Sequence, residues 1–275
     1  MNTLIHYFGD LEKRPLERAG FFIAGMLLLW AVEHIIPLLQ HQYKKTKARH
    51  AGTNLAFTAI HFFIHTLLAG GIVFIAGWTN SNGFGLVYWI NSGIVGTILI
   101  TCLTLDFFAG WLCHFVEHKF KIFWRFHIIH HADNNVDVTT GLRHHPLESV
   151  WRGIFFYLGI LASGAPMFAV LLYQTLLVFI TGFTHANIGL PKWLDTLIGF
   201  VLVSPNMHKV HHHWKQPYTD SNYGAVFSVW DRLFGTYMEL DPKEIRYGLD
   251  RYYPNEEDEN FIRLMKKPFQ NLEIK

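Results

Sequence analysis

The chain has 275 residues, of which 51% are hydrophobic, 16% aromatic and only 16% charged, whereas soluble domains carry about a quarter charged residues. This composition excludes an ordinary soluble domain and indicates an integral membrane protein, while a mean hydropathy of only +0.18 predicts a substantial polar part outside the bilayer. The formal net charge is +2, without a long basic run, so nucleic acid is not an expected partner. Cys102 and Cys113 lie too far apart on one apolar segment to form a disulfide.

The first part of the chain contains three apolar runs that are long enough to cross a hydrocarbon core of about 30 Å. Residues 1–19 mix acids, bases and apolar residues, and we expect a short interfacial segment there, without a cleavable signal peptide. The predicted spans follow at 20–39, at about 52–78 and at about 90–113.

The two loops between these spans predict the orientation of the protein. The first loop is basic, and the second, at 79–89, carries no charge. By the positive-inside rule the basic loop is cytoplasmic, so the end of the third span also returns to the cytoplasm. The basic residues of the first loop are Lys44, Lys45, Lys47 and Arg49.

The chain becomes polar after the third span, so residues 119–149 are expected outside the lipid. A second apolar region at 150–185 is divided by the sequence SGAP and predicts a helical hairpin that starts and ends on the cytoplasmic side. Residues 191–203 predict an interfacial helix, and FIRLMKKPF near the end of the chain predicts a surface helix.

These elements predict a single catalytic domain rather than two. We divide the chain into an N-terminal interfacial segment at 1–19, a membrane-embedded domain at 20–240 and a cytosolic tail at 241–275. The fold expected is all-α, with about three transmembrane helices, a helical hairpin and a histidine-rich cap on the cytoplasmic side.

Eight of the eighteen histidines occur at spacings that suit metal binding, and a ninth, His185, ends the predicted hairpin and should return to the same surface. The pattern HxxHH occurs twice, and on a helix its three rings fall within an arc of about 100°. Neutral imidazole is the commonest biological metal ligand, and nine ligands exceed the four to six that one ion uses, so the count predicts two metals. The candidate ligands are His114, His118, His127, His130, His131, His185, His208, His211 and His212.

The sequence around these histidines resembles the fatty acid hydroxylase and sterol desaturase superfamily. The resemblance covers roughly Thr101 to Tyr237. It is carried, in order, by DFFAGWLCHFVEHK, WRFHIIHHAD, VDVTTGLRHHPLE, FTHAN, PNMHKVHHH and DSNYGAVFSVWDRLFGTY.

The resemblance implies a membrane oxidoreductase with two iron ions (Fe2+/Fe3+) held by histidine boxes, and with zinc as the expected substitute in purified protein. Such enzymes use O2 and outside electrons to hydroxylate or desaturate lipids such as fatty acyl chains and sterols. Because the chain has no Rossmann fingerprint, CxxCH or iron–sulfur motif, we expect a separate electron donor. The resemblance implies a reductase with a cytochrome or ferredoxin.

Two further site residues are carried over from the family's pattern. Some relatives have a histidine four residues after the ligand at His185, where this chain has Gly189, and we expect Asn187 to hold a water in that gap. In the Arg-x-His-Pro element we expect His145 to support the ligands and His144 to be a solvated neighbour.

The acids near the boxes are candidates for orienting the imidazole rings. Asp106 lies two turns before His114 in an apolar segment, so we predict either a hydrogen bond to the metal ligands or a tie between two helices. His61 and His65 predict either a lipid channel wall or, as the favoured alternative, interhelical hydrogen bonds. The acids expected in solvent or at helix caps are Glu117, Asp133, Asp137, Asp220 and Asp231.

The function favoured by the sequence is lipid hydroxylation, because this reaction requires only one C–H bond to be held near the metals. Lipid or sterol desaturation with the same centre is the main alternative. A membrane metal transporter is a distant one, because most of the histidines lie in polar sequence beyond the spans. A zinc hydrolase is disfavoured because the chain has no HExxH motif.

Overall fold

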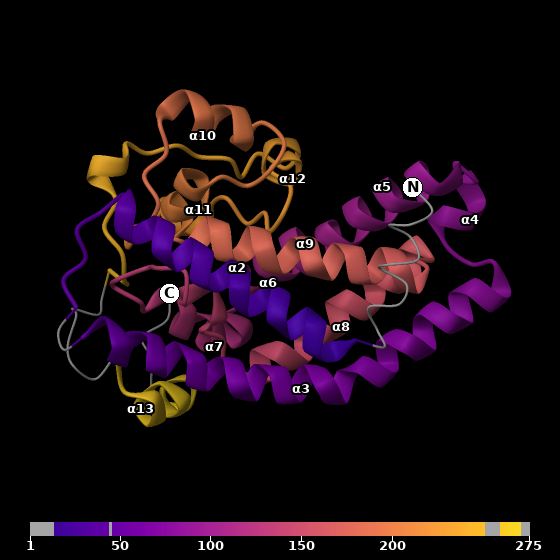
Figure 1. Cartoon of the computed structure of the whole chain (residues 1–275), viewed down its shortest axis with the longest axis horizontal. Coiled ribbons are helices and arrows are strands. Elements are labelled where there is room, and N and C mark those ends of the chain that lie inside the picture. Colours follow the sequence, from indigo (N-terminus) through magenta and orange to yellow (C-terminus); the bar gives the residue numbers. More distant parts are fainter. Residues whose placement is uncertain (1–13, 44–45, 251–258, 271–275) are drawn as a thin grey trace.

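The chain folds into helices joined by loops, which confirms the predicted all-α class. The computed structural model describes residues 14–43, 46–250 and 259–270, and these contain isolated β-bridges but no regular strand (Figure 1). The α-helices are α2 (Pro15–Ile35), α3 (Lys47–Asn82), α4 (Leu86–Ile90), α5 (Gly93–Leu105), α6 (Cys113–Lys119), α7 (Lys121–His131), α8 (Pro146–Ser163), α9 (Met167–His185), α10 (Lys192–Gly199), α11 (Pro205–His211), α12 (Val229–Leu233) and α13 (Phe261–Lys266).

Within the part of the chain that the structure describes, three segments are long and apolar enough to cross a membrane, as many as the sequence predicts, but α9 takes the place of the first predicted span. They are Lys47–Ile90, Gly93–Lys119 and Met167–His185. The first predicted span is shorter than expected, because the apolar part of α2 is only Ala19–Ile35. Its helix ends just before Pro37, since a proline disfavours helical backbone in the residue that precedes it.

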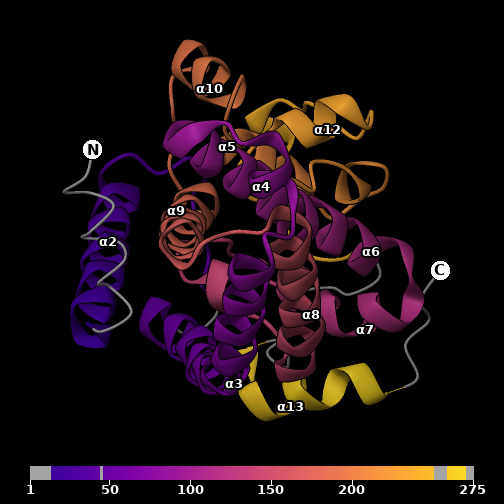
Figure 2. The same cartoon turned by 90° about the vertical axis from the view of Figure 1, so that its right-hand side faces the viewer.

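The predicted hairpin is formed by α8 and α9, which run in opposite directions from a shared turn (Figures 1 and 2), and α5 packs against both arms. The turn between them requires a glycine. Gly164 has a φ of +70°, and a Cβ there would lie 2.3 Å from the carbonyl oxygen of Phe84. The second arm, α9, ends at His185, so the hairpin returns to the end of the molecule where the other predicted ligands lie.

The helices that carry the histidine boxes gather at one end of the bundle, on the left in Figure 1, where α6, α7 and α11 surround the end of α9. A π-helical segment, Asp106–Leu112, lies between α5 and α6. Because a π-turn inserts an extra residue, it shifts the face that the following helix presents. The segment therefore sets the direction in which α6 presents its two histidines.

The predicted interfacial and surface helices are present as α10 and α13. On α10, Trp193 and Leu197 lie four residues apart and are largely exposed, as expected for a helix that rests on a lipid surface. The first 13 residues of the predicted N-terminal segment, and residues 251–258 and 271–275 of the predicted tail, lie outside the described residues.

Candidate metal centre

The structure brings all nine predicted ligands together in two adjacent groups. Within each group, one nitrogen of every ring lies within 4.8 Å of the others. The five-histidine group consists of His114, His118, His127, His131 and His211. The four-histidine group consists of His130, His185, His208 and His212.

Each HxxHH box contributes to both groups. In the first box His127 and His131, which lie four residues apart on one face of α7, join the five-histidine group, and His130 joins the other. In the second box the assignment is reversed, because the outer pair joins the four-histidine group and His211 joins the five-histidine group. Rings of the two groups stack across the boundary, with the His131 and His212 centroids 4.6 Å apart. The two groups therefore form one centre with two positions.

The nitrogens of the four-histidine group fit a shared cation. The Nδ1 of His185 donates to the carbonyl oxygen of Thr181, so its Nε2 carries a lone pair. This Nε2 lies 2.9, 3.1 and 3.3 Å from the Nε2 atoms of His208, His130 and His212. One in-plane lone pair cannot accept from three rings, whereas a tetrahedral ion with metal–nitrogen distances of about 2.1 Å separates its ligands by about 3.4 Å. The donor set therefore fits a metal ion.

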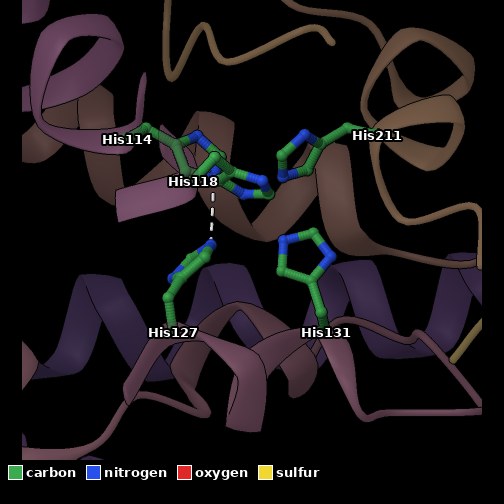
Figure 3. A group of neighbouring side chains, drawn as sticks. All are labelled: His114, His118, His127, His131 and His211. Carbon is green, nitrogen blue, oxygen red and sulfur yellow. Dashed lines mark hydrogen bonds between the residues drawn. The ribbon is translucent and has the colours of Figure 1, made fainter. Parts of the chain in front are cut away.

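The five-histidine group is oriented from outside by hydrogen-bond acceptors. Figure 3 shows its five rings pointing toward a common centre, with His127 and His131 opposite the other three. The Nδ1 atoms of His114 and His211 donate to the carbonyl oxygens of Tyr223 and Ser221. Since a carbonyl only accepts, the Nε2 atoms of these two rings keep their lone pairs for the centre. The Nε2 of His118 and both nitrogens of His131 are buried without a hydrogen-bond partner among the described residues.

Burial keeps these imidazoles neutral, which is the form that binds metals. It lowers the pKa of His130, His131 and His212 well below the usual value, and the neighbouring rings lower it further. It lowers the pKa of His211 to about 4. The rings therefore stay unprotonated at neutral pH even before a metal binds.

The buried carboxylate of Glu148 links the centre to His144, which was expected to be a solvated neighbour. Glu148 Oε1 accepts from the Nδ1 of His127 at 2.9 Å and from the Nδ1 of His144 at 2.8 Å. The His144 ring also stacks on His130, with centroids 4.6 Å apart. Arg152 donates to the same oxygen and to Glu117, so one guanidinium is shared by these two buried carboxylates. The structure therefore corrects the expectation for His144, which lies against the ligands.

The expectation for His145 was also wrong. Its Nδ1 accepts from the backbone nitrogen of Leu147 and caps the start of α8, while its ring packs between Phe126 and Phe269. It cannot support the metal ligands, because these contacts turn it away from both groups. The roles of the two adjacent histidines are the reverse of those expected, because His145 is the N-cap of α8 and uses its side chain there, whereas His144 precedes the cap.

Asn187 does not face the centre. Its amide is bound on both ends to the backbone of Leu39, with Oδ1 accepting at 3.0 Å and Nδ2 donating at 2.8 Å. Its own backbone nitrogen donates to the buried Glu33. The predicted water-holding role is therefore corrected to a tie between the end of α9 and the segment that follows α2.

Asp106 ties helices together and makes no hydrogen bond to any histidine among the described residues. Oδ1 accepts from the hydroxyl of Tyr173 and the backbone of Val226, and Oδ2 accepts from the backbone of Phe227 and the indole of Trp230. The sequence left two alternatives for Asp106, a hydrogen bond to the metal ligands or a tie between two helices, and the structure supports the tie.

The other acids were placed in solvent or at caps by the sequence, and most are instead buried. Only Asp220 is partly exposed, and its Oδ1 faces the Nδ1 of His118 at 3.2 Å. Asp231 accepts from the backbone of Tyr223 and Gly224, so it caps the loop behind His114. The four buried acids are Glu117, Asp133, Asp137 and Asp231.

A buried network that the sequence missed supports the end of α7. His50 Nε2 lies 2.9 Å from both oxygens of Asp133, and its Nδ1 lies 3.4 Å from Asp137. Although burial raises the pKa of Asp133, His50 and Arg143 hold it below its ordinary value. A single histidine in the first turn of α3 has no spacing signal, so only the three-dimensional contact identifies it.

The favoured prediction for His61 and His65 was interhelical hydrogen bonds, and the structure shows one for His61. The Nδ1 of His61 bonds the hydroxyl of Ser149 across the α3–α8 interface at 2.7 Å, and the two imidazole rings are 4.1 Å apart. This contact joins two helices below the metal centre.

Comparison with known proteins gives one family match. The family model "Fatty acid hydroxylase" matches residues 98–236, which include all nine histidines. No solved structure matches the chain.

Several curated proteins match over different lengths. Alkylglycerol monooxygenase of Xenopus tropicalis is 31% identical over 153 residues, covering 54% of this chain and 32% of that protein. Ornithine lipid hydroxylase OlsE of Rhizobium tropici is 24% identical over 238 residues, covering 78% of this chain and 69% of that protein. Very-long-chain aldehyde decarbonylase GL1-7 of Oryza sativa subsp. japonica is 24% identical over 243 residues, covering 83% of this chain and 37% of that protein. The chain thus spans only about a third of the alkylglycerol monooxygenase.

Proposed function

Because the chain belongs to the fatty acid hydroxylase family, we propose that it is a membrane-embedded oxygenase that inserts one atom of O2 into a C–H bond of a lipid. The observation that carries the proposal is the pair of adjacent histidine groups, buried at the end of an apolar helical bundle. The reaction consumes O2, two electrons and two protons, and it yields the hydroxylated lipid and one water. Two relatives, the alkylglycerol monooxygenase and the ornithine lipid hydroxylase, are named for oxidation of lipids.

Two iron ions would occupy the two groups and supply the activation of O2 with electrons from a separate donor. The chain's own contribution is placement and exclusion of water. Glu148 and Asp220 fix the tautomers of His127 and His118 by hydrogen bonds to their Nδ1 atoms. Because the nine rings are buried, bulk water is kept from the bond to be oxidised.

We place the lipid's polar end at the membrane surface and its apolar chain along the bundle. The ligands lie near or beyond the ends of the candidate spans, since His185 is the last residue of one span and His118 is the second-last of another. Together with the basic loop before α3, this supports a centre at the cytoplasmic face. The exposed apolar side of α10 beside the centre supports contact with the lipid surface there.

Desaturation by the same centre is the nearest alternative, because both reactions begin by removing one hydrogen from a C–H bond. A metal transporter is less well supported, because ion pathways place their ligands along the middle of the spans. Of the nine histidines, those of α7 and α11 lie outside the candidate spans altogether.

The test is a reaction under 18O2 with purified protein, a reductase system and candidate ether lipids, ornithine lipids and fatty acyl lipids, followed by mass spectrometry. The proposal predicts one 18O atom in the product, and no product from the His211→Ala variant. The adjacent His213→Ala variant should remain active, because His213 lies outside both groups. A product two mass units lighter without label would identify a desaturase instead.

A further inference from the structure

One buried cation near the centre has no part in the chemistry described so far. Lys209 lies inside the second HxxHH box, directly after His208, and its side chain is fully buried. Lysine is almost never fully buried unless its ammonium has partners. On α11 it is one residue, about 100°, from His208, so it leaves the helix on a different face from the ligands.

The partners of Lys209 are main-chain carbonyls at the end of α9. Its Nζ donates to the carbonyl oxygen of Ala186 at 2.5 Å and to that of Thr184 at 3.4 Å. These two carbonyls stand on either side of His185, the last residue of the helix. The last carbonyls of a helix have no donor within the helix, and a cation is favourable at this end. The ammonium therefore fastens the backbone that carries His185.

This contact joins two of the three helices that build the four-histidine group. His185 comes from α9, whereas His208 and His212 come from α11 and its C-cap. The rings meet closely, with Nε2 of His185 2.9 Å from that of His208. By contrast, the five-histidine group contains no residue of α9. A change in the α9–α11 link should thus act on one group and spare the other.

We propose that Lys209 is a positioning residue for the metal in the four-histidine group: by holding the end of α9 against α11 it keeps His185 in place, and it sets the affinity of that position without touching the ion. The inference rests on the two-metal centre proposed above. A lysine that served only general stability would alter both positions alike, or neither.

The test is titration of metal-free protein with Co2+, followed by the visible absorption of the bound ion, in wild type and in Lys209→Met. Methionine keeps the apolar length of the side chain and removes the donors. Wild type should bind in two phases, and in the variant one position should lose about tenfold or more in affinity while the other changes by less than about twofold. Lys215→Met, at an exposed lysine near the same box, should match wild type.

A double-mutant cycle tests whether Lys209 acts through His185. In a His185→Ala background, adding Lys209→Met should change the Co2+ affinities by less than about twofold. Independent, additive losses would overturn the proposal. So would a folded Lys209→Met variant with both phases unchanged or both weakened equally.

If Lys209→Met does not fold, Lys209→Gln takes its place, because the glutamine amide keeps a donor for the Ala186 carbonyl. It should weaken the same single position by a smaller factor, and unchanged affinity at both positions would overturn the proposal. Wild-type protein that lacks two Co2+ phases would overturn the two-metal centre as well, so the failures of the two proposals are distinguishable.

Discussion

Replacing Asp106 by asparagine should destabilise the protein without emptying the metal centre. The carboxylate accepts four hydrogen bonds in a fully buried site, two on each oxygen. An asparagine amide presents one NH2 group, which cannot accept. Of the two orientations of the amide, the better one places the NH2 group at the position of Oδ1. There the hydroxyl of Tyr173 can rotate to accept from it, and only the backbone N–H of Val226 is left unpaired.

The size of the effect follows from that count. One buried N–H without an acceptor costs about 1–3 kcal/mol, so we expect a loss of about 2 kcal/mol in Asp106→Asn. The Asp106→Ala variant leaves all four donors unpaired and should lose at least about 4 kcal/mol. For a chain of this size, 2 kcal/mol corresponds to a fall of about 4–8 °C in Tm.

The assay is thermal unfolding in detergent combined with the metal content of the folded fraction. Asp106→Asn should lower Tm while the metal content per folded chain stays at the wild-type value, and the exposed control Asp250→Asn should change neither. Loss of metal or of activity at unchanged Tm would refute the reasoning, because it would place Asp106 in the metal centre rather than between helices.

Two further predictions concern pH and orientation. Burial lowers the pKa of His211 to about 4, so between this value and its ordinary 6.5 the unfolded chain binds more protons than the folded one. The contribution of His211 to the stability of metal-free protein is therefore full above about pH 6.5 and falls by about 2 kcal/mol at pH 5. It is measured as a drop in Tm that His211→Phe reduces, and a Tm independent of pH would contradict this. For orientation, a cysteine at Ser81 should react with an impermeant thiol reagent in intact cells, whereas one at Arg49, on the basic and cytoplasmic side, should not. Both native cysteines are buried and should give no background labelling. The opposite labelling would place the metal centre outside.

Eight histidines of the centre were predicted because their spacing repeats on helices, and the ninth, His185, because it ends the predicted hairpin. HxxHH on a helix fixes which rings share a face, and that local geometry holds in both boxes. The division into five and four was not predictable, because it depends on how α7 and α11 are turned toward each other. His130 and His211 each cross to the group opposite their own box partners, and no local rule indicates this.

The roles of the single residues around the centre were predicted less well, and for a physical reason. Whether His144 or His145 faces the ligands depends on where α8 begins, and Asn187 is taken by the backbone of Leu39, which lies far away in the sequence. Glu148 was not singled out at all, because one acid near a histidine box has no periodic signal. Such contacts are set by the packing of distant segments, which spacing along the chain does not record.

The central claim is that two metals occupy the two histidine groups, and the most direct measurement is the metal content of purified, folded protein. Wild type should contain close to two metal ions per chain, with iron in the active form. His130→Ala and His211→Ala, which remove one ligand from each group, should both lower this content, whereas His213→Ala should not. Full metal loading in both ligand variants, or no bound metal in the wild type, would contradict the account.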